Sequence, residues 1–216
     1  MRFRDRGEAG RELAARFTEW RRQGRLDDPV VLGLPRGGVP VAAEIAAALH
    51  APLDVLVVRK IGAPYNPEVG IGALAGDRPP VFDERALAVL GLAPERLAAR
   101  VEAERAELRR REELYRGGRP APRLRGRTVV VVDDGLATGA TARAALRAVR
   151  ASGPARLLLA VPVCSGQALT ALRGEADEIV YLYQPPYFEA VGQWYDDFAQ
   201  LTDAEVVRAL ATTHDA

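Results

Sequence analysis

The sequence contains one cysteine, one lysine and two histidines among 216 residues, and it carries almost no net charge. The single cysteine, Cys164, cannot form an intramolecular disulfide and leaves no cysteine cluster for a zinc ribbon. With a formal net charge of +1, the chain lacks the strong overall positive charge that is typical of proteins that bind nucleic acids or membrane surfaces. A binding site for anions must therefore be built locally.

Long apolar runs are also lacking. No stretch approaches the roughly 20 apolar residues that a transmembrane helix needs, and the charged start MRFRDRGEAGRELAARF lacks the apolar region of a signal peptide. The chain shows no internal repeat and no long Gly/Ser linker. We therefore expect a single domain over residues 1–216 that is cytoplasmic, without a membrane or nucleic-acid partner.

Apolar, strand-like runs alternate along the chain with helical patterns. The expected strands are 29–35, 53–58, 127–133, 155–163 and 176–182. The expected helices are 6–23, 39–49, 94–116, 140–152 and 166–173, with two short helices at the end of the chain. Residues 62–82 are rich in Gly and Pro and are expected to form loops with short extended pieces. The alternation predicts an α/β fold with a Rossmann-like, mostly parallel twisted sheet of about five strands flanked by helices, with its core at about 29–182.

The stretch VVVVDDGLATGAT at 129–141 leads an apolar strand into two adjacent carboxylates and then into a loop of small residues. Small residues let backbone N–H groups converge, and the following helix N-terminus adds partial positive charge. With the hydroxyls of Thr138 and Thr141, this loop can bind a phosphate. The alternative is an ordinary strand–turn–helix with Thr138 as the N-cap.

The adjacent carboxylates of Asp133 and Asp134 favour a more specific ligand. They would repel a bound phosphate unless they bind hydroxyl groups or a cation. A sugar phosphate supplies both, through its ribose hydroxyls and through a magnesium ion held mainly by its other phosphates.

This stretch resembles the phosphoribosyl-pyrophosphate (PRPP) binding motif of type I phosphoribosyltransferases, in the order strand, acidic pair, loop and helix. The resemblance implies a protein that binds Mg-PRPP and transfers ribose 5-phosphate to a nitrogenous base, releasing pyrophosphate. It implies that Asp133 and Asp134 contact the ribose hydroxyls and are the protein's candidate magnesium ligands. It also implies that the 5-phosphate binds at Ala137, Thr138, Gly139, Ala140 and Thr141.

The family also predicts a pyrophosphate loop after the first core strand, where GLPRGGVP stands. Arg36 offers a charge-delocalised fork for pyrophosphate oxygens, and Gly37 and Gly38 allow a close backbone approach. The non-proline cis peptide found in this loop in the family is expected at Arg36–Gly37.

The second expected strand ends in a basic pair, Arg59 and Lys60, and Lys60 is the only lysine of the chain. The resemblance implies that this pair faces the same ligand and stabilises the departing pyrophosphate, as a similar Arg-Lys pair does in adenine and orotate members. A solvated strand end is the alternative.

The sequence departs from the family pattern in three places. Ala137 stands where the hypoxanthine-guanine branch has an aspartate proposed as the base. No mobile catalytic loop is recognisable after the second strand, and no motif identifies the base-binding hood. We expect the N-terminal segment, an inserted helix at about 94–116 and an aromatic segment at 181–211 to form a small hood or lid.

Seven aromatic side chains lie within residues 181–198. Tyr187, Phe188 and Trp194 are candidates to stack on an acceptor base. The alternative is packing of this segment against the sheet or against a partner in the expected homodimer. The charged helix at 94–116 is a solvated, salt-bridged helix by default, or a lid or dimer contact.

Two other patterns are rejected. GIGALA at 70–75 fits a dinucleotide fingerprint, but no apolar strand leads into it and no helix follows. Cys164 has no identifiable base to make it a nucleophile. The main alternative to a transferase is therefore a non-catalytic protein of the same fold that senses PRPP or a nucleotide, which the missing catalytic loop and base favour.

Overall fold

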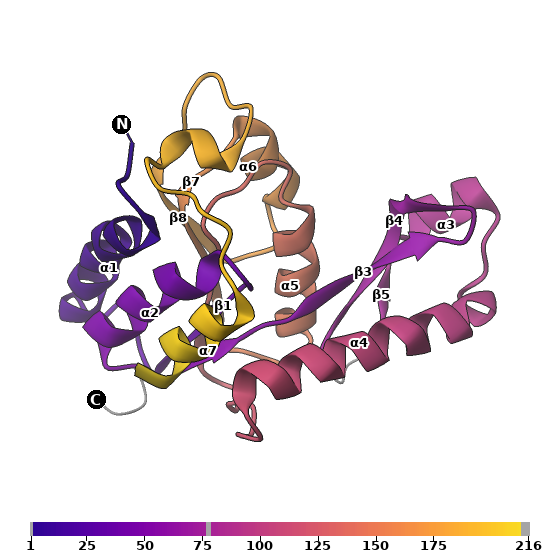
Figure 1. Cartoon of the computed structure of the whole chain (residues 1–216), viewed down its shortest axis with the longest axis horizontal. Helices are drawn as coiled ribbons and strands as arrows, with labels where there is room; N and C mark the ends of the chain where they lie inside the picture. The colour runs from indigo at the N-terminus through magenta and orange to yellow at the C-terminus, as the bar shows by residue number, and fades with distance from the viewer. Residues whose placement is uncertain (1, 77–78, 213–216) are drawn as a thin grey trace.

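The computed structural model describes residues 2–76 and 79–212, and its centre is a five-stranded sheet in the order β2-β1-β6-β7-β8 (Figure 1). All neighbouring strands of this sheet pair in parallel. Its strands are β2 (Leu53–Val55), β1 (Pro29–Gly33), β6 (Thr128–Val132), β7 (Arg156–Val163) and β8 (Glu178–Tyr183). The predicted parallel α/β sheet is confirmed. The residues of β1, β2, β6 and β7 are almost all buried on both faces, so helices must cover each face.

Alternate residues of the strands pack against different helices. One face packs with α1 (Arg6–Arg22), α2 (Gly38–Leu49) and α7 (Asp203–Thr212) through Val31, Val130, Val132, Leu158 and Ala160. The other face packs with α5 (Ala140–Arg150) and α6 (Gly166–Leu172) through Val30, Leu32, Val129, Val131, Leu157 and Leu159. The two buried clusters follow the period of two that a strand imposes on its side chains.

Strands β1 and β6 are paired over their whole length, and Gly33 is opposite Val132 at their carboxyl ends. The loops that follow these strands therefore leave the sheet side by side. This is the edge at which parallel α/β sheets bind ligands.

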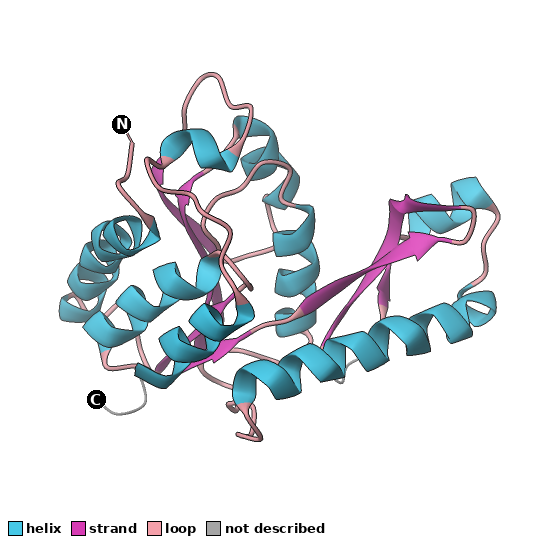
Figure 2. Cartoon of the chain, in the orientation of Figure 1, coloured by secondary structure: helices cyan, strands magenta, loops and turns pink. Residues whose placement is uncertain are grey.

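A second sheet, antiparallel and three-stranded, replaces the loops expected at 62–82. It consists of β3 (Val58–Ala63), β4 (Asn66–Ala75) and β5 (Val81–Phe82). Figure 2 shows it extending away from the central sheet, with α3 (Glu84–Leu90) near its far end and α4 (Ala98–Arg116) alongside. A short 3-10 helix at Pro94–Leu97 precedes α4. The expected second strand at 53–58 is therefore too long, since the parallel strand ends at Val55.

The N-terminal and C-terminal segments meet near the carboxyl edge of the central sheet. Phe3 forms an isolated bridge with Tyr195, just after the 3-10 helix η2 (Val191–Trp194). Phe3 and Tyr195 are almost completely buried, and their ring centroids lie 5.6 Å apart. The aromatic segment thus packs on the start of the chain.

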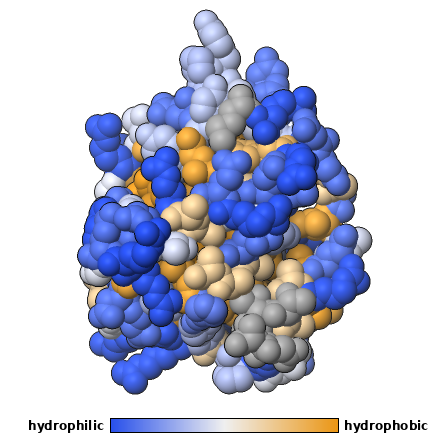
Figure 3. All heavy atoms as spheres, turned by 90° about the vertical axis from the view of Figure 1, so that its left-hand side faces the viewer, coloured by the Kyte–Doolittle hydropathy of each residue, from blue (hydrophilic) through white to orange (hydrophobic). Residues whose placement is uncertain are grey.

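Hydrophilic residues dominate the face of the molecule seen in Figure 3, and the apolar atoms lie between them. Scattered apolar atoms of this kind are normal on a folded protein. Within residues 2–76 and 79–212, no helix combines the length and the apolar character needed to cross a bilayer.

Candidate functional site

The loop after β1 lies directly on the carboxylates that follow β6. A Cβ atom added to Gly37 would lie 1.9 Å from the Oδ2 atom of Asp134, and one added to Gly38 would lie 2.4 Å from the carbonyl oxygen of Val132. No side chain fits at either position without displacing these atoms. The structure therefore brings the expected pyrophosphate loop and the expected ribose-binding pair into contact.

The loop contains a non-proline cis peptide, but between Pro35 and Arg36. The prediction of Arg36–Gly37 is therefore wrong by one residue. Gly37 itself has a right-handed helical conformation and leads into α2. The Arg36 side chain is exposed.

The two carboxylates have different surroundings. Burial, and then the charge of Asp134, raises the pKa of Asp133 well above its usual value. Burial also raises the pKa of Asp134, but Arg6 opposes this rise through an ion pair of 2.8 Å between Nε and Oδ2. Desolvation and mutual repulsion thus make the ionised pair costly unless a ligand donates hydrogen bonds to it.

Arg6 is the site residue that the sequence analysis missed. Its side chain and that of Asp134 are only 11% and 13% exposed. The guanidinium also donates to the carbonyl of Ala199 and lies 4.0 Å from the ring centroid of Phe198. The Tyr195 hydroxyl donates to the Asp134 carbonyl at 2.6 Å. The N-terminal and C-terminal segments therefore each form a hydrogen bond with Asp134, through Arg6 and Tyr195.

The loop before α5 has the open amide groups that a phosphate site needs. Gly139, with a φ of 76°, is the N-cap of α5, and no side chain caps this helix. The interpretation of Thr138 as the N-cap is wrong, although its hydroxyl accepts a long bond of 3.4 Å from the Ala140 N–H. Ala137, Thr138, Ala140 and Thr141 are exposed. The first N–H groups of α5 thus lack intrahelical partners and point toward solvent.

The chain segment after β7 holds this loop in place. The Ser165 hydroxyl donates to the Ala137 carbonyl at 2.6 Å and accepts from the Ala168 N–H at 2.9 Å. Leu136 also forms a bridge with Cys164. The candidate phosphate loop is therefore anchored to the neighbouring strand and to α6.

Arg59 and Lys60 lie in β3 of the antiparallel sheet, so their expected place at the end of the second parallel strand is wrong. The Arg59 guanidinium binds Glu104 of α4, with an Nη2–Oε2 distance of 2.6 Å. Lys60 lines a cavity of 340 Å³ together with Thr141 and Arg143 of α5. The structure thus brings Lys60 to the candidate phosphate loop and directs Arg59 to α4.

The candidate base-contacting aromatics are partly engaged with one another. Trp194 packs edge-on against Tyr183, with centroids 5.2 Å apart, and stacks with Phe188 at 6.3 Å. Tyr187 is 86% exposed and lies outside this cluster. The nearby Val191 covers Gly135, since a Cβ atom there would lie 2.5 Å from Val191 Cγ1. The aromatic segment therefore lies over the loop that contains the acidic pair.

The donor set suits magnesium only in combination with substrate oxygens. Across residues 2–76 and 79–212, no group of three or more His, Cys, Asp or Glu side chains could hold a metal ion. Mg²⁺ is usually bound by one or two carboxylates together with substrate phosphates. Asp133 and Asp134 fit that arrangement.

We expect Cys164 to be inert in the folded protein. Its side chain is fully buried, and burial raises its pKa to about 12, so the reactive thiolate is almost absent at pH 8. Ellman's reagent should modify the protein at pH 8 only after unfolding in urea, and then at one thiol. Labelling of the native protein at the rate of the unfolded chain would contradict this prediction.

Comparisons with known proteins agree with this geometry. The family profile described as "Phosphoribosyl transferase domain" matches residues 5–184. Proteins from Mycobacterium tuberculosis strains CDC 1551 and H37Rv, each named "Putative phosphoribosyl transferase", are 47% identical over 212 residues, which is 98% of this chain and 47% of theirs. The chain thus spans about half the length of these curated relatives.

A solved structure is similar over the whole fold. The crystal structure of TT1426 from Thermus thermophilus has a TM-score of 0.86 and 46% sequence identity, covering 98% of this chain and 99% of that one. The family match covers β1, β6 and the loops that form the candidate site. The chain therefore belongs to the phosphoribosyl transferase domain family.

Proposed function

We propose that the protein binds Mg-PRPP and transfers its ribose 5-phosphate to a nitrogenous base, with release of pyrophosphate. The observation that carries this proposal is the contact of the Gly37 backbone with the Asp134 carboxylate. It joins a glycine loop for pyrophosphate to an acidic pair for ribose, beside a helix N-terminus for the 5-phosphate. One extended ligand with these three parts matches the three loops.

The ribose 5-phosphate half of the ligand binds after β6. The open N–H groups at the start of α5 and the hydroxyls of Thr138 and Thr141 donate to the 5-phosphate. Asp133 and Asp134 accept hydrogen bonds from the two ribose hydroxyls. These bonds stabilise the ionised carboxylates and so oppose the rise in pKa that burial causes at both groups. Binding thus orients the sugar with its C1 atom toward the loop after β1.

The pyrophosphate half binds at Arg36, Gly37 and Gly38, whereas Lys60 reaches the ligand from β3 on the side of Thr141, with which it shares a cavity. When the C1–oxygen bond breaks, negative charge accumulates on pyrophosphate and positive charge on the ribose. Fixed hydrogen-bond donors around the pyrophosphate stabilise its negative charge, and the carboxylates beside the ribose stabilise its positive charge. Neither group has to reorganise during the reaction. Bound Mg²⁺ would neutralise part of the phosphate charge.

The proposed acceptor of the ribose 5-phosphate is a flat nitrogenous base. Ala137 provides no carboxylate that could remove a proton from a purine, so catalysis by such a base is not part of this proposal. The aromatic segment over Gly135 offers faces for a flat base. We place Tyr187, Phe188 and Trp194 there as the candidate contacts.

A sensor of PRPP or of a nucleotide is the second candidate function. The Arg59–Glu104 ion pair favours it, because an arginine engaged with α4 cannot also stabilise a leaving group. Such a protein would keep the ligand contacts and lack turnover.

Incubation with Mg-PRPP and a panel of nucleobases separates these functions. We expect PRPP to raise the melting temperature and at least one base to trigger pyrophosphate release, measured with a coupled phosphate assay. Stabilisation without release on any base would favour the sensor. No stabilisation by PRPP would contradict both the transferase and the PRPP sensor.

A further inference from the structure

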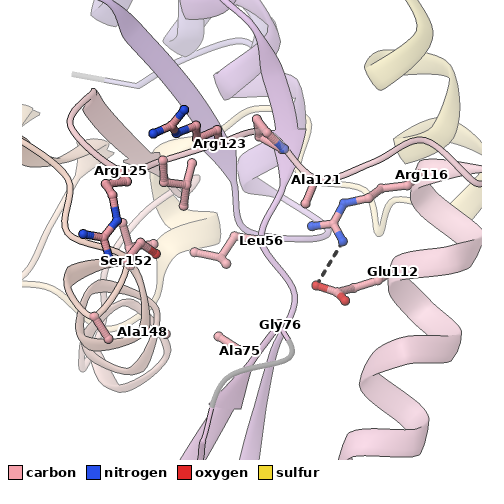
Figure 4. Close-up of a pocket in the computed structure, with 14 residues that line it drawn as sticks. Leu56, Ala75, Gly76, Glu112, Arg116, Ala121, Arg123, Arg125, Ala148 and Ser152 are labelled. Atoms are coloured by element: carbon pink, nitrogen blue, oxygen red, sulfur yellow. Dashed lines mark ion pairs between the residues drawn. The ribbon is translucent and has the colours of Figure 1, made fainter.

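A cavity of 530 Å³ lies away from the loops described above, between α4, α5 and the segment that links α4 to β6 (Figure 4). Arg116 and Glu112 enter it from α4, whereas Ala148 and Ser152 line the α5 side. From Thr141 to Ser152, α5 and its last turn span roughly 16 Å at 1.5 Å per residue. The cavity is thus near the opposite end of α5 from the candidate phosphate loop.

Among the described residues, Arg116, Arg123 and Arg125 are opposed by Asp54 and Glu112, which leaves this cavity a net charge of +1. The Arg116 guanidinium is neutralised by Asp54 at 2.8 Å and by Glu112 at 3.3 Å. Arg123 and Arg125 are exposed on the cavity wall. Within residues 2–76 and 79–212, no carboxylate forms an ion pair with either of them. Their guanidinium groups are therefore available to an anion.

A buried hydroxyl lies beside one of these arginines. Ser152 is only 8% exposed, and its Oγ atom has no hydrogen-bond partner in the described part of the chain. Arg125 Cζ lies 4.0 Å from the position of a Cβ on the adjacent Gly153. A buried hydroxyl without a partner costs about 1–3 kcal/mol, but this Oγ atom is closed to solvent and does not contact a ligand in the cavity directly.

The end of α5 does not oppose an anion here. The Val149 carbonyl accepts from the Ser152 N–H at 2.8 Å, and the Arg150 carbonyl accepts from the Gly153 N–H at 3.1 Å. These bonds reduce the negative charge that the C-terminus of a helix otherwise presents.

The rest of the cavity wall is apolar. Leu56, Ala75, Leu124, Ala148 and Val149 contribute hydrocarbon surface. A volume of 530 Å³ is within the range of about 300–1,000 Å³ that is typical of small-molecule sites. Inorganic phosphate would leave most of this space and all of this surface unused.

We propose that this cavity binds a nucleoside phosphate. Arg123 and Arg125 donate to its phosphate, and the nucleoside packs on the apolar wall. The proposal requires no turnover and no PRPP binding, so it stands independently of the function proposed above.

Calorimetric titration of the purified protein with AMP, GMP, CMP and UMP, and separately with inorganic phosphate, tests the proposal. We expect at least one nucleotide to bind more tightly than phosphate. Its dissociation constant should rise at least about tenfold in Arg123→Ala with Arg125→Ala, because two charge-assisted contacts are lost. Ser152→Ala should leave binding unchanged, because the Oγ atom is not accessible to the ligand. Arg16→Ala with Arg85→Ala removes two exposed arginines elsewhere and should leave binding unchanged.

The carboxylate variant Asp133→Asn with Asp134→Asn separates binding in this cavity from binding at the acidic pair. We expect it to keep the binding that depends on Arg123 and Arg125. Three results would overturn the proposal: no binding of any nucleotide at about 1 mM, unchanged binding in the arginine variant, or complete loss of binding in the carboxylate variant. Binding of phosphate as tight as that of every nucleotide would also overturn it. Melting temperatures of all variants would exclude unfolding as the cause.

Discussion

Replacing both carboxylates, as Asp133→Asn with Asp134→Asn, should weaken PRPP binding by about 10- to 100-fold. Each replacement exchanges a charge-assisted hydrogen bond to a ribose hydroxyl, worth about 1.5–3 kcal/mol, for a weaker neutral one. A tenfold change corresponds to about 1.4 kcal/mol. Titration calorimetry with Mg-PRPP measures the loss directly. An unchanged affinity would refute the assignment of this pair to the ribose.

A second acidic pair provides the matched control. Asp27 and Asp28 precede β1 at the amino edge of the sheet, where Asp28 binds Arg127. Asp27→Asn with Asp28→Asn removes the same number of charges and should leave PRPP affinity within a factor of two to three, since exposed pairs contribute about 0–1 kcal/mol.

The single variant Asp133→Asn should bind PRPP poorly and yet be more stable than the parent protein. Because the pKa of Asp133 is raised in the folded state, the folded protein holds this proton more tightly than the unfolded chain. The free energy of unfolding therefore falls as pH rises above the unfolded value near 3.8. At pH 7 asparagine removes this penalty and keeps an acceptor for the Asp134 N–H. A higher melting temperature at pH 7, with a smaller difference at pH 4, is the expected result.

The largest stability effect is expected at Arg6. Arg6→Met keeps an apolar stem under Phe198 but leaves the Asp134 carboxylate buried without its cation. Removal of one partner of a buried ion pair costs about 3–5 kcal/mol. Urea unfolding at pH 7 should show this loss as a lower transition midpoint with an unchanged slope.

A neighbouring arginine and a double variant complete this experiment. Arg2 forms an exposed pair with Asp196, and the two side chains are 57% and 60% exposed. Arg2→Met removes this pair and a hydrogen bond to the Tyr195 carbonyl, so it should change stability by no more than about 1.5 kcal/mol. Arg6→Met with Asp134→Asn should recover part of the loss, because the unpaired charge is gone. An Arg6 variant as stable as the Arg2 variant would contradict the role of the ion pair.

The sheet edge of the site could be predicted because its signals are local. The apolar run before Asp133 and the small residues after Asp134 are contiguous in sequence, and strand order then places them beside Gly37. Parallel pairing of β1 with β6 was enough to bring both loops together.

The antiparallel sheet was missed because its glycines were interpreted as loop residues. Gly62 lies against the backbone of Pro67, and Gly72 lies against Val81 and Phe82. Register shifts flank Gly62 within the β3–β4 pair. Glycine in a strand often marks such bulges and close approaches, but this interpretation requires knowledge of the partner strand.

Arg6 could not have been found from the sequence. It lies 128 residues from Asp134, in a chain whose basic residues are almost all arginine. Nothing local distinguishes it from the neighbouring arginines of α1. Only the fold of both chain ends over the sheet edge shows which arginine meets the acidic pair.

The Ser165 hydroxyl, which joins the Ala137 carbonyl to the first turn of α6, has a kinetic consequence for ligand capture. A loop held from behind before the ligand arrives loses little conformational freedom on binding. Association at this loop should then be limited by diffusional encounter and not by a slow ordering step. Ser165→Ala would loosen the loop, so that the loop would have to lose conformational entropy when the ligand binds. The expected result is slower association.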